Sequence, residues 1–277
     1  MRALGIDIGG TGIKGAVVEL ESGALVSERV RERTPLSATP EAAADVVVRV
    51  CERLVEGGWL TPDLPAGAGV PVVVKGGVSM TAANVDASWI GAPIEALLRE
   101  RLGRAVVALN DADAAGLAEV AFGAGKGHAG VILLLTIGTG IGSALIVDGR
   151  LVPNTELGHL LLHGRGAETL VSGAARERRH RGWKRWAREF NEYLALVESY
   201  LWPDLLILGG GVSKEIGRYE RYLRARAPIV PAAMLNTSGI VGAAMAAVAV
   251  PAAEARGVSE SMAEEEAAIA IAGASGP

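Results

Sequence analysis

The chain contains one cysteine among its 277 residues, so no disulfide can form within it. This scarcity of cysteine favours a reducing compartment, and we expect a cytoplasmic protein. The single thiol, Cys51, is separated from Val47, Val50 and Leu54 by intervals that place all four on one side of a helix. Because such a position is typical of a core, Cys51 is expected to be structural rather than nucleophilic.

Long apolar segments are missing as well. No uninterrupted apolar run reaches the roughly 18–20 residues of a membrane span. The first residues show neither the basic nor the apolar region of a secretory signal, so no such signal is expected. The net charge of −4 argues against a general nucleic-acid binder. We therefore expect neither a membrane nor a nucleic acid among the partners.

What the chain does contain is enough apolar material for a sizeable core. Apolar residues make up 50% of the sequence and charged residues 21%, which excludes global disorder. A length of 277 residues is long for one domain and comfortable for two.

The most informative stretch covers residues 4–18, LGIDIGGTGIKGAVV. Alternating apolar residues, clustered glycines and a β-branched run predict a strand, a tight turn and a second strand. Glycines allow positive φ in such a turn and expose backbone N–H groups to an anion such as phosphate. Asp7, Thr11 and Lys14 add a metal-facing carboxylate, a hydroxyl donor and a positive charge. The stretch therefore indicates a phosphate-binding hairpin.

The same layout recurs in residues 133–146, LLLTIGTGIGSALI. The four letters of residues 10–13, GTGI, return unchanged as residues 138–141. A repeated phosphate hairpin predicts two similar α/β halves that face one another across a cleft.

Two other phosphate motifs are disfavoured. Residues 10–15 satisfy the dinucleotide pattern G-x-G-x-x-G, but that pattern must open a helix, whereas Val17 and Val18 favour a strand. The Walker pattern G-x-x-x-x-G-K-[ST] is absent from the sequence.

Periodicity and capping residues predict the remaining elements. We expect strands over residues 25–32, 67–70, 105–109 and 205–208, and helices over residues 39–56, 93–102, 112–120 and 239–250. A further helix is expected to carry the apolar positions Trp183, Trp186, Phe190, Leu194, Val197 and Leu201 in the core and to end at Pro203. Ser213 is expected to cap the next helix.

The junction after strand 105–109 has chemical interest. Asn110 and Asp111 lie where that strand meets a helix, and ligands of open α/β sheets bind at such ends. The helix dipole is expected to keep Asp111 ionised. A purely capping role for Asn110 or Asp111 remains an alternative, and both roles are compatible.

Glu156 and His159 form an E-x-x-H pair, and Glu177 and His180 form a second one. Two such pairs can mark a di-iron site in a helical bundle. That site is disfavoured because the first pair lies in a loop interrupted by Pro and Gly and the second in a run of charges. We expect Glu156 and His159 to converge on hydroxyl groups, with a satisfied core pair as the alternative.

Taken together, the motifs resemble those of the ROK sugar kinases and, within that family, of the polyphosphate glucokinases, including polyphosphate/ATP glucomannokinases. The resemblance runs from Asp7 to about Ala246. It implies an α/β, actin-like two-domain ATPase fold of the ribonuclease H-like type with a cleft between its domains. The implied small domain is 1–109, joined by the C-terminal helix 239–277, and the implied large domain is 110–238.

The implied reaction moves the terminal phosphoryl group of polyphosphate or ATP to the 6-hydroxyl of glucose, and of mannose, with Mg²⁺ near Asp7. Asp111 matches the family's catalytic base. The implied sugar-binding residues are Asn84, Asn110, Glu156, His159 and Glu168. The implied donor-binding residues are Asp7, Gly9, Gly10, Thr11, Lys14, Thr136, Gly138, Thr139, Gly140, Gly210 and Gly211.

Seven cations lie between residues 176 and 188, with Glu177 as the only acid among them. A solvated helix face is one explanation. The other is a track for a linear polyanion, because ATP with its three phosphates would not need so long a stripe. The candidate polyphosphate residues are Arg178, Arg179, Arg181, Lys184 and Arg185.

One departure from the family concerns zinc. Many ROK proteins carry a zinc-binding cysteine cluster after the E-x-G-H motif, which this chain lacks, so no zinc is expected. The resemblance also implies a homodimer. Two alternatives stay open: an ATP-only kinase for fructose or N-acetylmannosamine, and a non-catalytic sugar sensor. Repressor relatives carry an N-terminal helix-turn-helix, whereas the first strand here is expected to begin at residue 3.

Overall fold

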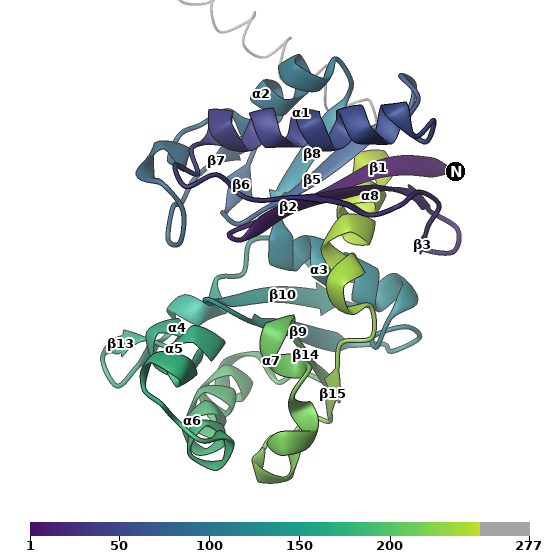
Figure 1. Cartoon of the computed structure of the whole chain (residues 1–277). Coiled ribbons are helices and arrows are strands. Elements are labelled where there is room, and N and C mark those ends of the chain that lie inside the picture. The colour runs from purple at the N-terminus through teal and green to yellow at the C-terminus, as the bar shows by residue number, and fades with distance from the viewer. Residues whose placement is uncertain (250–277) are drawn as a thin grey trace, which may run out of the picture. The chain divides into compact units, whose positions relative to one another are not determined.

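The chain folds around two β-sheets that share one plan (Figure 1). The computed structural model describes residues 1–249, and residues 1–247 form one unit. The first sheet has the order β3-β2-β1-β5-β8, with β4 also paired to β2. Strands β1 and β2 are antiparallel, whereas β5 lies parallel to β1 and β8 parallel to β5. Its strands are β1 (Arg2–Gly9), β2 (Gly12–Glu19), β3 (Ala24–Leu25), β4 (Val30–Glu32), β5 (Ala66–Val70) and β8 (Val106–Asn110).

The second sheet has the order β11-β10-β9-β14-β15. Strands β9 and β10 are antiparallel, β14 lies parallel to β9, and β15 lies parallel to β14. Its strands are β9 (Val131–Ile137), β10 (Ile141–Val147), β11 (Arg150–Val152), β14 (Leu205–Gly209) and β15 (Ile229–Pro231). Each sheet thus begins with a hairpin and continues with two parallel strands. This confirms the internal repeat predicted from the two G-T-G-I segments.

Short ribbons and helices complete the architecture. The two ribbons pair β6 (Val74–Lys75) with β7 (Val78–Ser79), and β12 (Leu161–Leu162) with β13 (Arg165–Gly166). The α-helices are α1 (Pro40–Glu56), α2 (Ile94–Leu102), α3 (Asp111–Phe122), α4 (Glu168–Val171), α5 (Gly173–Arg178), α6 (Trp183–Leu201), α7 (Gly210–Ser213) and α8 (Ser238–Ala249). Single 3₁₀ turns are η1 (Ala87–Trp89), η2 (Leu157–His159), η3 (Ile216–Arg218), η4 (Glu220–Tyr222) and η5 (Leu235–Thr237).

Helix α1 covers the outer face of the first sheet and encloses one core. Thr39 caps it by accepting the N–H of Ala42 at 3.3 Å, and Pro40 occupies its first position. Val47, Val50 and Leu54 are fully buried, and Cys51 is buried beside them. Burial raises the pKa of the Cys51 thiol to about 12, so this thiol stays protonated at neutral pH. The structural role predicted for Cys51 is confirmed.

Helices α3 and α8 lie between the two sheets (Figure 1). Helix α8 approaches the first sheet at two glycines, Gly5 of β1 and Gly67 of β5. A Cβ on Gly5 would overlap the carbonyl oxygen of Ile240, and a Cβ on Gly67 would overlap that of Ala243. Helix α8 meets α3 in the same way, because a Cβ on Gly242 would overlap the carbonyl of Ala114. Glycine is therefore required at each of these crossings.

The predicted strand over residues 25–32 is wrong in its extent. Two short strands, β3 and β4, occupy its ends, and both pair with β2 rather than forming one continuous strand. The segment between them turns so that the Ser27 hydroxyl accepts the N–H of Val17 at 2.9 Å. Between β3 and β4, the Ser27 side chain thus takes the place of a backbone partner for β2. The alternation of apolar residues gives no sign of such a side-chain contact.

The basic run does not form one helix face. Helix α5 ends at Arg178 and α6 begins at Trp183, so the run crosses a break. His180 has a positive φ of 47°, which a helix cannot contain, and Gly182 caps α6. The prediction for Ser213 is also wrong: it ends α7, and its hydroxyl donates back to the carbonyl of Gly210.

The other predicted elements are confirmed with shifts of one or two residues at their ends. Strand β5 stops before Pro71, and Gly76 and Gly77 form a turn with positive φ. No helix within residues 1–249 combines the length and apolar character required to cross a bilayer. The division into 1–109 and 110–238 stays a prediction, and residues 250–277 of its C-terminal helix lie outside the described residues.

Candidate active site

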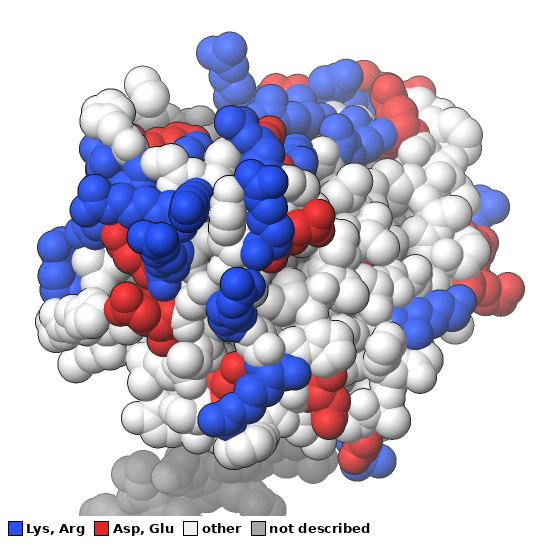
Figure 2. Space-filling model, turned by 90° about the horizontal axis from the view of Figure 1, so that it is seen from below, with Lys and Arg blue, Asp and Glu red and all other residues white. Residues whose placement is uncertain are grey.

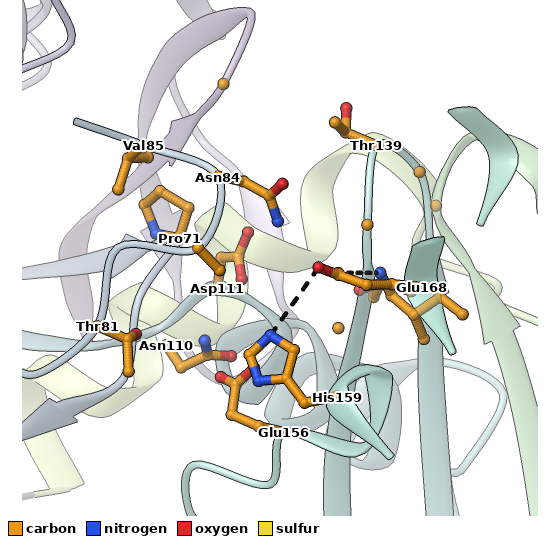
Figure 3. Close-up of a pocket in the computed structure, with 18 residues that line it drawn as sticks. Pro71, Thr81, Asn84, Val85, Asn110, Asp111, Thr139, Glu156, His159 and Glu168 are labelled. Atoms are coloured by element: carbon orange, nitrogen blue, oxygen red, sulfur yellow. Dashed lines mark hydrogen bonds and ion pairs between the residues drawn. The ribbon is translucent and has the colours of Figure 1, made fainter. Parts of the chain in front are cut away.

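A pocket of about 250 Å³ lies between the two halves of the chain (Figure 3). Both phosphate hairpins, the β8–α3 junction and the loop after β11 contribute to it. Its lining residues are Gly10, Pro71, Thr81, Ala83, Asn84, Val85, Asn110, Asp111, Thr136, Gly138, Thr139, Gly140, Ile141, Gly142, Glu156, His159, Glu168 and Gly210. The structure therefore places all six residues predicted for catalysis and sugar binding around one cavity, here called the first pocket.

Asn110 and Asp111 hold the position predicted for them. The Asn110 side chain caps α3 by accepting the N–H groups of Ala112 at 2.9 Å and Asp113 at 3.2 Å. Its amide also donates to the carbonyl of Val72 at 3.2 Å, which ties the end of β8 to the loop after β5. The capping role and the pocket-lining role are thus compatible, as expected. Asn110 is oriented by three hydrogen bonds, and the next residue, Asp111, also lines the pocket (Figure 3).

The ionisation predicted for Asp111 from the helix dipole needs correction. Burial, and secondly the negative charge of Asp7, raise the pKa of Asp111 to about 7. The N–H of Ala112 lowers this pKa, but by less than burial raises it. Desolvation of the charged form thus outweighs the stabilisation that the start of α3 offers to a negative charge. A carboxyl with this pKa can both accept and release a proton near neutral pH.

Glu156, His159 and Glu168 form a polar group on the opposite side of the pocket. The His159 ring lies between the two carboxylates, with Nδ1 3.9 Å from Glu156 Oε2 and Nε2 3.9 Å from Glu168 Oε1 (Figure 3). Burial raises the pKa of Glu156, while His159 opposes that rise. The 3.9 Å separations leave room for hydroxyl groups to reach both carboxylates. Glu177 and His180 lie outside this pocket, so the two E-x-x-H pairs do not meet.

Gly140 has a specific structural reason to be glycine. The Glu168 carboxylate accepts the N–H of Ile141 at 3.3 Å and lies where a Cβ of Gly140 would be. The second hairpin can therefore hold Glu168 only because its turn lacks a side chain at this position. Asn84 reaches the same turn from the first half, since its amide nitrogen would lie 3.1 Å from that Cβ.

The first hairpin contributes less of the lining than predicted. Gly10 lines the pocket, whereas Gly9, Thr11, Lys14 and Asp7 do not. The Asp7 carboxylate pairs with the Lys14 ammonium at 2.7 Å, and both side chains are largely buried. The negative charge of Asp7 nevertheless helps to raise the pKa of Asp111. The Asp7–Lys14 ion pair therefore lies close to the pocket without lining it. Within residues 1–249, no group of three or more His, Cys, Asp or Glu side chains could hold a metal ion.

A second pocket, of about 460 Å³, adjoins the first. The two share Gly138 and Thr139 in the turn between β9 and β10. Its lining residues are Ile137, Gly138, Thr139, Gly173, Ala174, Arg176, Glu177, Trp183, Gly211, Val212, Glu215 and Arg218. Of the sequence candidates, only Gly138, Thr139 and Gly211 line it, with Gly210 in the first pocket. Trp183 belongs to this lining and also packs against the core beneath α6, so the predicted core position is only partly buried.

The five candidate polyphosphate residues line neither pocket. Arg181 is 13% exposed and pairs with Glu189, which also faces Arg185 at 3.7 Å. Arg178 and Lys184 are exposed. This end of the molecule is shown in Figure 2, where Lys and Arg side chains gather with some Asp and Glu side chains between them. The run supplies positive charge to the surface beside the second pocket rather than to either cavity.

One connection between the halves escaped the sequence analysis. The Asn154 amide accepts the N–H of Val74 at 3.1 Å and donates to the carbonyl of Val74 at 2.9 Å, as a neighbouring strand would. Its own N–H donates to the Asp113 carboxylate at 2.7 Å. Asp113 is 1% exposed, and burial raises its pKa to about 6. Asn154 thus joins the ribbon before Thr81 to the loop before Glu156.

No local signal could have identified this bridge. The P-N-T segment at residues 153–155 predicts only a turn, and Asn154 does adopt a positive φ of 61°. The partner Val74 is 80 residues away in the chain. Thr81 and Val85 were missed for the same reason, because only the fold brings them to the pocket.

We expect Asn154→Ala to loosen this bridge. Loss of both bonds to Val74 should lower the free energy of unfolding by about 1–3 kcal/mol and expose the Val74 N–H to solvent. Amide hydrogen exchange should therefore quicken at Val74 by at least about tenfold. Asn154→Gly removes the same amide without the strain of positive φ and should behave alike, while Asn236→Ala serves as the exposed control. Unchanged exchange at Val74 in both Asn154 variants would contradict the bridge.

Comparisons with known proteins agree with this geometry. The model of the ROK family matches residues 3–177. The polyphosphate glucokinase of Mycobacterium tuberculosis (strain CDC 1551 / Oshkosh) is 47% identical over 249 residues, which cover 90% of this chain and 92% of that protein. The polyphosphate glucokinase of Mycobacterium leprae is 46% identical, covering 90% of this chain and 75% of that protein.

Solved structures of ROK kinases also match this chain. The inorganic polyphosphate/ATP-glucomannokinase from Arthrobacter sp. strain KM superposes with a TM-score of 0.85 at 50% identity, covering 88% of this chain and 97% of that one. A ROK family glucokinase from Streptomyces griseus, in complex with glucose and AMPPNP, has a TM-score of 0.72 at 27% identity, covering 89% and 99%. The fold is the actin-like ATPase fold of these kinases, as predicted. The chain belongs to the ROK family.

Proposed function

We propose that this chain is a polyphosphate- and ATP-dependent glucokinase that phosphorylates the 6-hydroxyl of glucose and of mannose. The observation that carries the proposal is the position of Asp111 in the first pocket, between a polar group suited to hydroxyls and the glycine turn shared with the second pocket. The likeness to polyphosphate glucokinases and to a polyphosphate/ATP-glucomannokinase supports the choice of substrates.

Phosphoryl transfer mainly requires that the attacking hydroxyl be aligned with the terminal phosphorus and that the charge on the transferred group be stabilised. In this proposal the sugar occupies the side lined by Glu156, His159 and Glu168. Its 6-hydroxyl donates its proton to the Asp111 carboxylate while the oxygen attacks the terminal phosphorus. The bond from that phosphorus to the bridging oxygen of the donor breaks, and ADP or a polyphosphate one phosphate shorter leaves with the electron pair. The backbone N–H groups of the Gly138–Gly140 turn and the Thr139 hydroxyl would face the transferred phosphoryl group.

The sugar would be held by side chains from both halves. Asn84 comes from the first half, and Glu156, His159 and Glu168 come from the second. A ring bound between them would draw the halves together around Asp111 and exclude water from the reacting oxygen. Asn110 would contribute its oriented amide from the base of the pocket.

The residues present fit a magnesium ion that arrives with the donor. Mg²⁺ is usually held by one or two carboxylates together with substrate phosphates, so a cage of three protein ligands is not required. Asp7 is the carboxylate placed for this role, behind Gly10 and close enough to Asp111 to raise its pKa. When bound, Mg²⁺ would neutralise charge on the donor phosphates.

The family resemblance and the single cysteine support two further parts of the proposal. We propose that the chain acts in the cytoplasm and as a homodimer. We also propose the division into a small domain over 1–109 and a large domain over 110–238, because all but the last residue of the first sheet lies in the first range and the second sheet lies in the second range.

The activity itself is tested by a matrix of donors and acceptors. We expect glucose to be phosphorylated with either ATP or long-chain polyphosphate, and mannose to be accepted with both. Polyphosphate should inhibit the ATP reaction competitively, since both donors end beside Asp111. Fructose and N-acetylmannosamine serve as comparison sugars. Activity with ATP alone, or on N-acetylmannosamine rather than glucose, would overturn the proposal.

The role of Asp111 predicts a pH dependence. Asp111 accepts a proton only when ionised, so kcat/KM should rise with pH through about 7, the pKa to which burial raises this carboxyl. Asp111→Asn keeps the shape and should lower kcat about 10²–10⁴-fold. Glucose binding, measured by calorimetry, should survive this substitution. A variant with near-normal kcat would remove Asp111 from the mechanism and favour a different base.

Glu156 should act on the sugar and not on the donor. Glu156→Ala leaves a sugar hydroxyl unpaired, which costs about 1–3 kcal/mol, so the KM for glucose should rise about 5- to 150-fold. The KM for ATP should change little, because Glu156 lies away from the second pocket. Glu192→Ala, an exposed glutamate paired with His163, is the matched control. A rise in the ATP KM alone would move Glu156 to the donor side.

A further inference from the structure

We infer that a polyphosphate chain leaves the second pocket along a strip of cations that two distant segments build together. One segment holds Arg176 and Lys184, around the break between α5 and α6. The other holds Arg218, Arg221 and Arg224, in and after η3 and η4. This cation strip rests on the proposed use of polyphosphate, and it places the outer phosphates on a segment outside the basic run that the sequence indicated.

The two pockets set the direction of the chain. A donor whose terminal phosphate lies beside Asp111 can continue past Thr139, because that residue lines both cavities. Beyond Thr139 the only cations that line the second pocket, among the described residues, are Arg176 and Arg218. A linear polyanion therefore meets these two guanidinium groups first.

Trp183 holds these two arginines together. The Arg176 guanidinium lies 4.0 Å from the centre of the Trp183 ring, and the Arg218 guanidinium lies 5.6 Å from it. The ring also stacks on Tyr219 at 5.1 Å. Two segments more than thirty residues apart are thus joined around one indole. Cation–π contacts of this kind orient a guanidinium before a ligand arrives.

A second layer of the same kind follows one residue further along α6. Lys184 lies 6.0 Å from the centre of the Tyr222 ring, and Arg221 lies 4.8 Å from it. Arg221 also donates to the Tyr222 hydroxyl at 2.7 Å. Since Trp183 and Lys184 are neighbours and Tyr219 and Tyr222 are three residues apart, this layer continues the first one. Arg224 comes next and is held by the carbonyl of Leu223 at 2.8 Å.

The charges along the strip support an outward path. In the second pocket, Arg176 lies 3.6 Å from Glu177 and Arg218 lies 3.2 Å from Glu215, so each has a carboxylate nearby. Lys184, Arg221 and Arg224 form no ion pair with any described residue. Positive charge without a carboxylate partner thus lies in the outer layer. Figure 2 shows Lys and Arg side chains gathered at this end of the molecule, with some Asp and Glu side chains among them.

The strip suits a long polyanion better than it suits ATP. The three phosphates of a bound ATP would lie within the two pockets, whereas Arg221 and Arg224 line neither cavity. Cations that the fold has already oriented lose little side-chain entropy when they bind a phosphate. Each phosphate that they neutralise also releases counterions, so this part of the binding should weaken as salt rises.

The test compares donors of different length. The measured quantity is kcat/KM for long-chain polyphosphate divided by kcat/KM for tripolyphosphate, with glucose as acceptor. We expect Arg221→Gln combined with Arg224→Gln to lower this ratio about tenfold or more at low salt. The salt dependence of kcat/KM for long polyphosphate should also become shallower, by about one to two in the log–log slope for two lost charges.

Three further double variants serve as a charge control, a charge-conserving replacement and a test of the basic run. Arg150→Gln combined with Arg165→Gln removes two exposed charges elsewhere on the same half and should leave the ratio unchanged. Arg221→Lys combined with Arg224→Lys keeps the charge and should restore most of the ratio. Arg178→Gln combined with Arg179→Gln tests the basic run itself and should lower the ratio less than the Arg221 and Arg224 pair does.

Two outcomes would contradict the proposed path of polyphosphate along the cation strip. A ratio that falls equally in the Arg150 and Arg165 control would mean that net charge alone matters. A ratio that falls only in the Arg178 and Arg179 variant would assign the path to the basic run. If the unaltered protein used no polyphosphate at all, the proposed function would fail, and the wild-type assay separates that outcome from failure of the strip alone.

Discussion

The close crossing of α8 over the first sheet is the constraint on which the rest of the structure depends. Gly5 and Gly67 carry no side chains where the carbonyls of Ile240 and Ala243 lie against them, and Gly242 meets α3 in the same way. A methyl group at any of these positions would push the helix away by more than packing can absorb.

Burial of Asp111 determines its chemistry. Helix α3 lies between the sheets (Figure 1), and burial disfavours the ionised form of its first residue, Asp111. Asp7 adds its negative charge from β1, which belongs to the same sheet as β8. The two carboxylates raise the free energy of the ionised state, and the pKa of Asp111 increases toward neutrality. A base with this pKa can take a proton from a hydroxyl and return it to solvent. The Lys14 ammonium keeps Asp7 itself paired.

The part of the site proposed for the phosphoryl donor depends on the break between helices α5 and α6. The interruption between α5 and α6 at residues 179–182 leaves Trp183 half-buried, with its ring available to both Arg176 and Arg218. Trp183, the first residue of α6 after the break, packs against the core and is also the joint between two cationic segments.

The sequence by itself determined the features whose cause is local. Clustered glycines between β-branched runs predict the two hairpins, Thr39 and Pro40 predict the start of α1, and the Asn110–Asp111 junction predicts a polar group at a strand end. Each of these depends on residues within a few positions of one another, so a linear pattern contains the necessary information. The repeated G-T-G-I segment extended this to the two-sheet plan and the cleft.

Only the tertiary structure decided the properties that depend on distant partners. The pKa of Asp111 near 7 results from burial that no local pattern reports and, secondly, from the charge of Asp7, 104 residues away. The bridge from Asn154 to Val74 and the pairing of Arg176 with Arg218 around Trp183 likewise join residues far apart in the chain. Periodicity describes which face of an element is apolar, but desolvation and contact between elements depend on how those faces are finally packed.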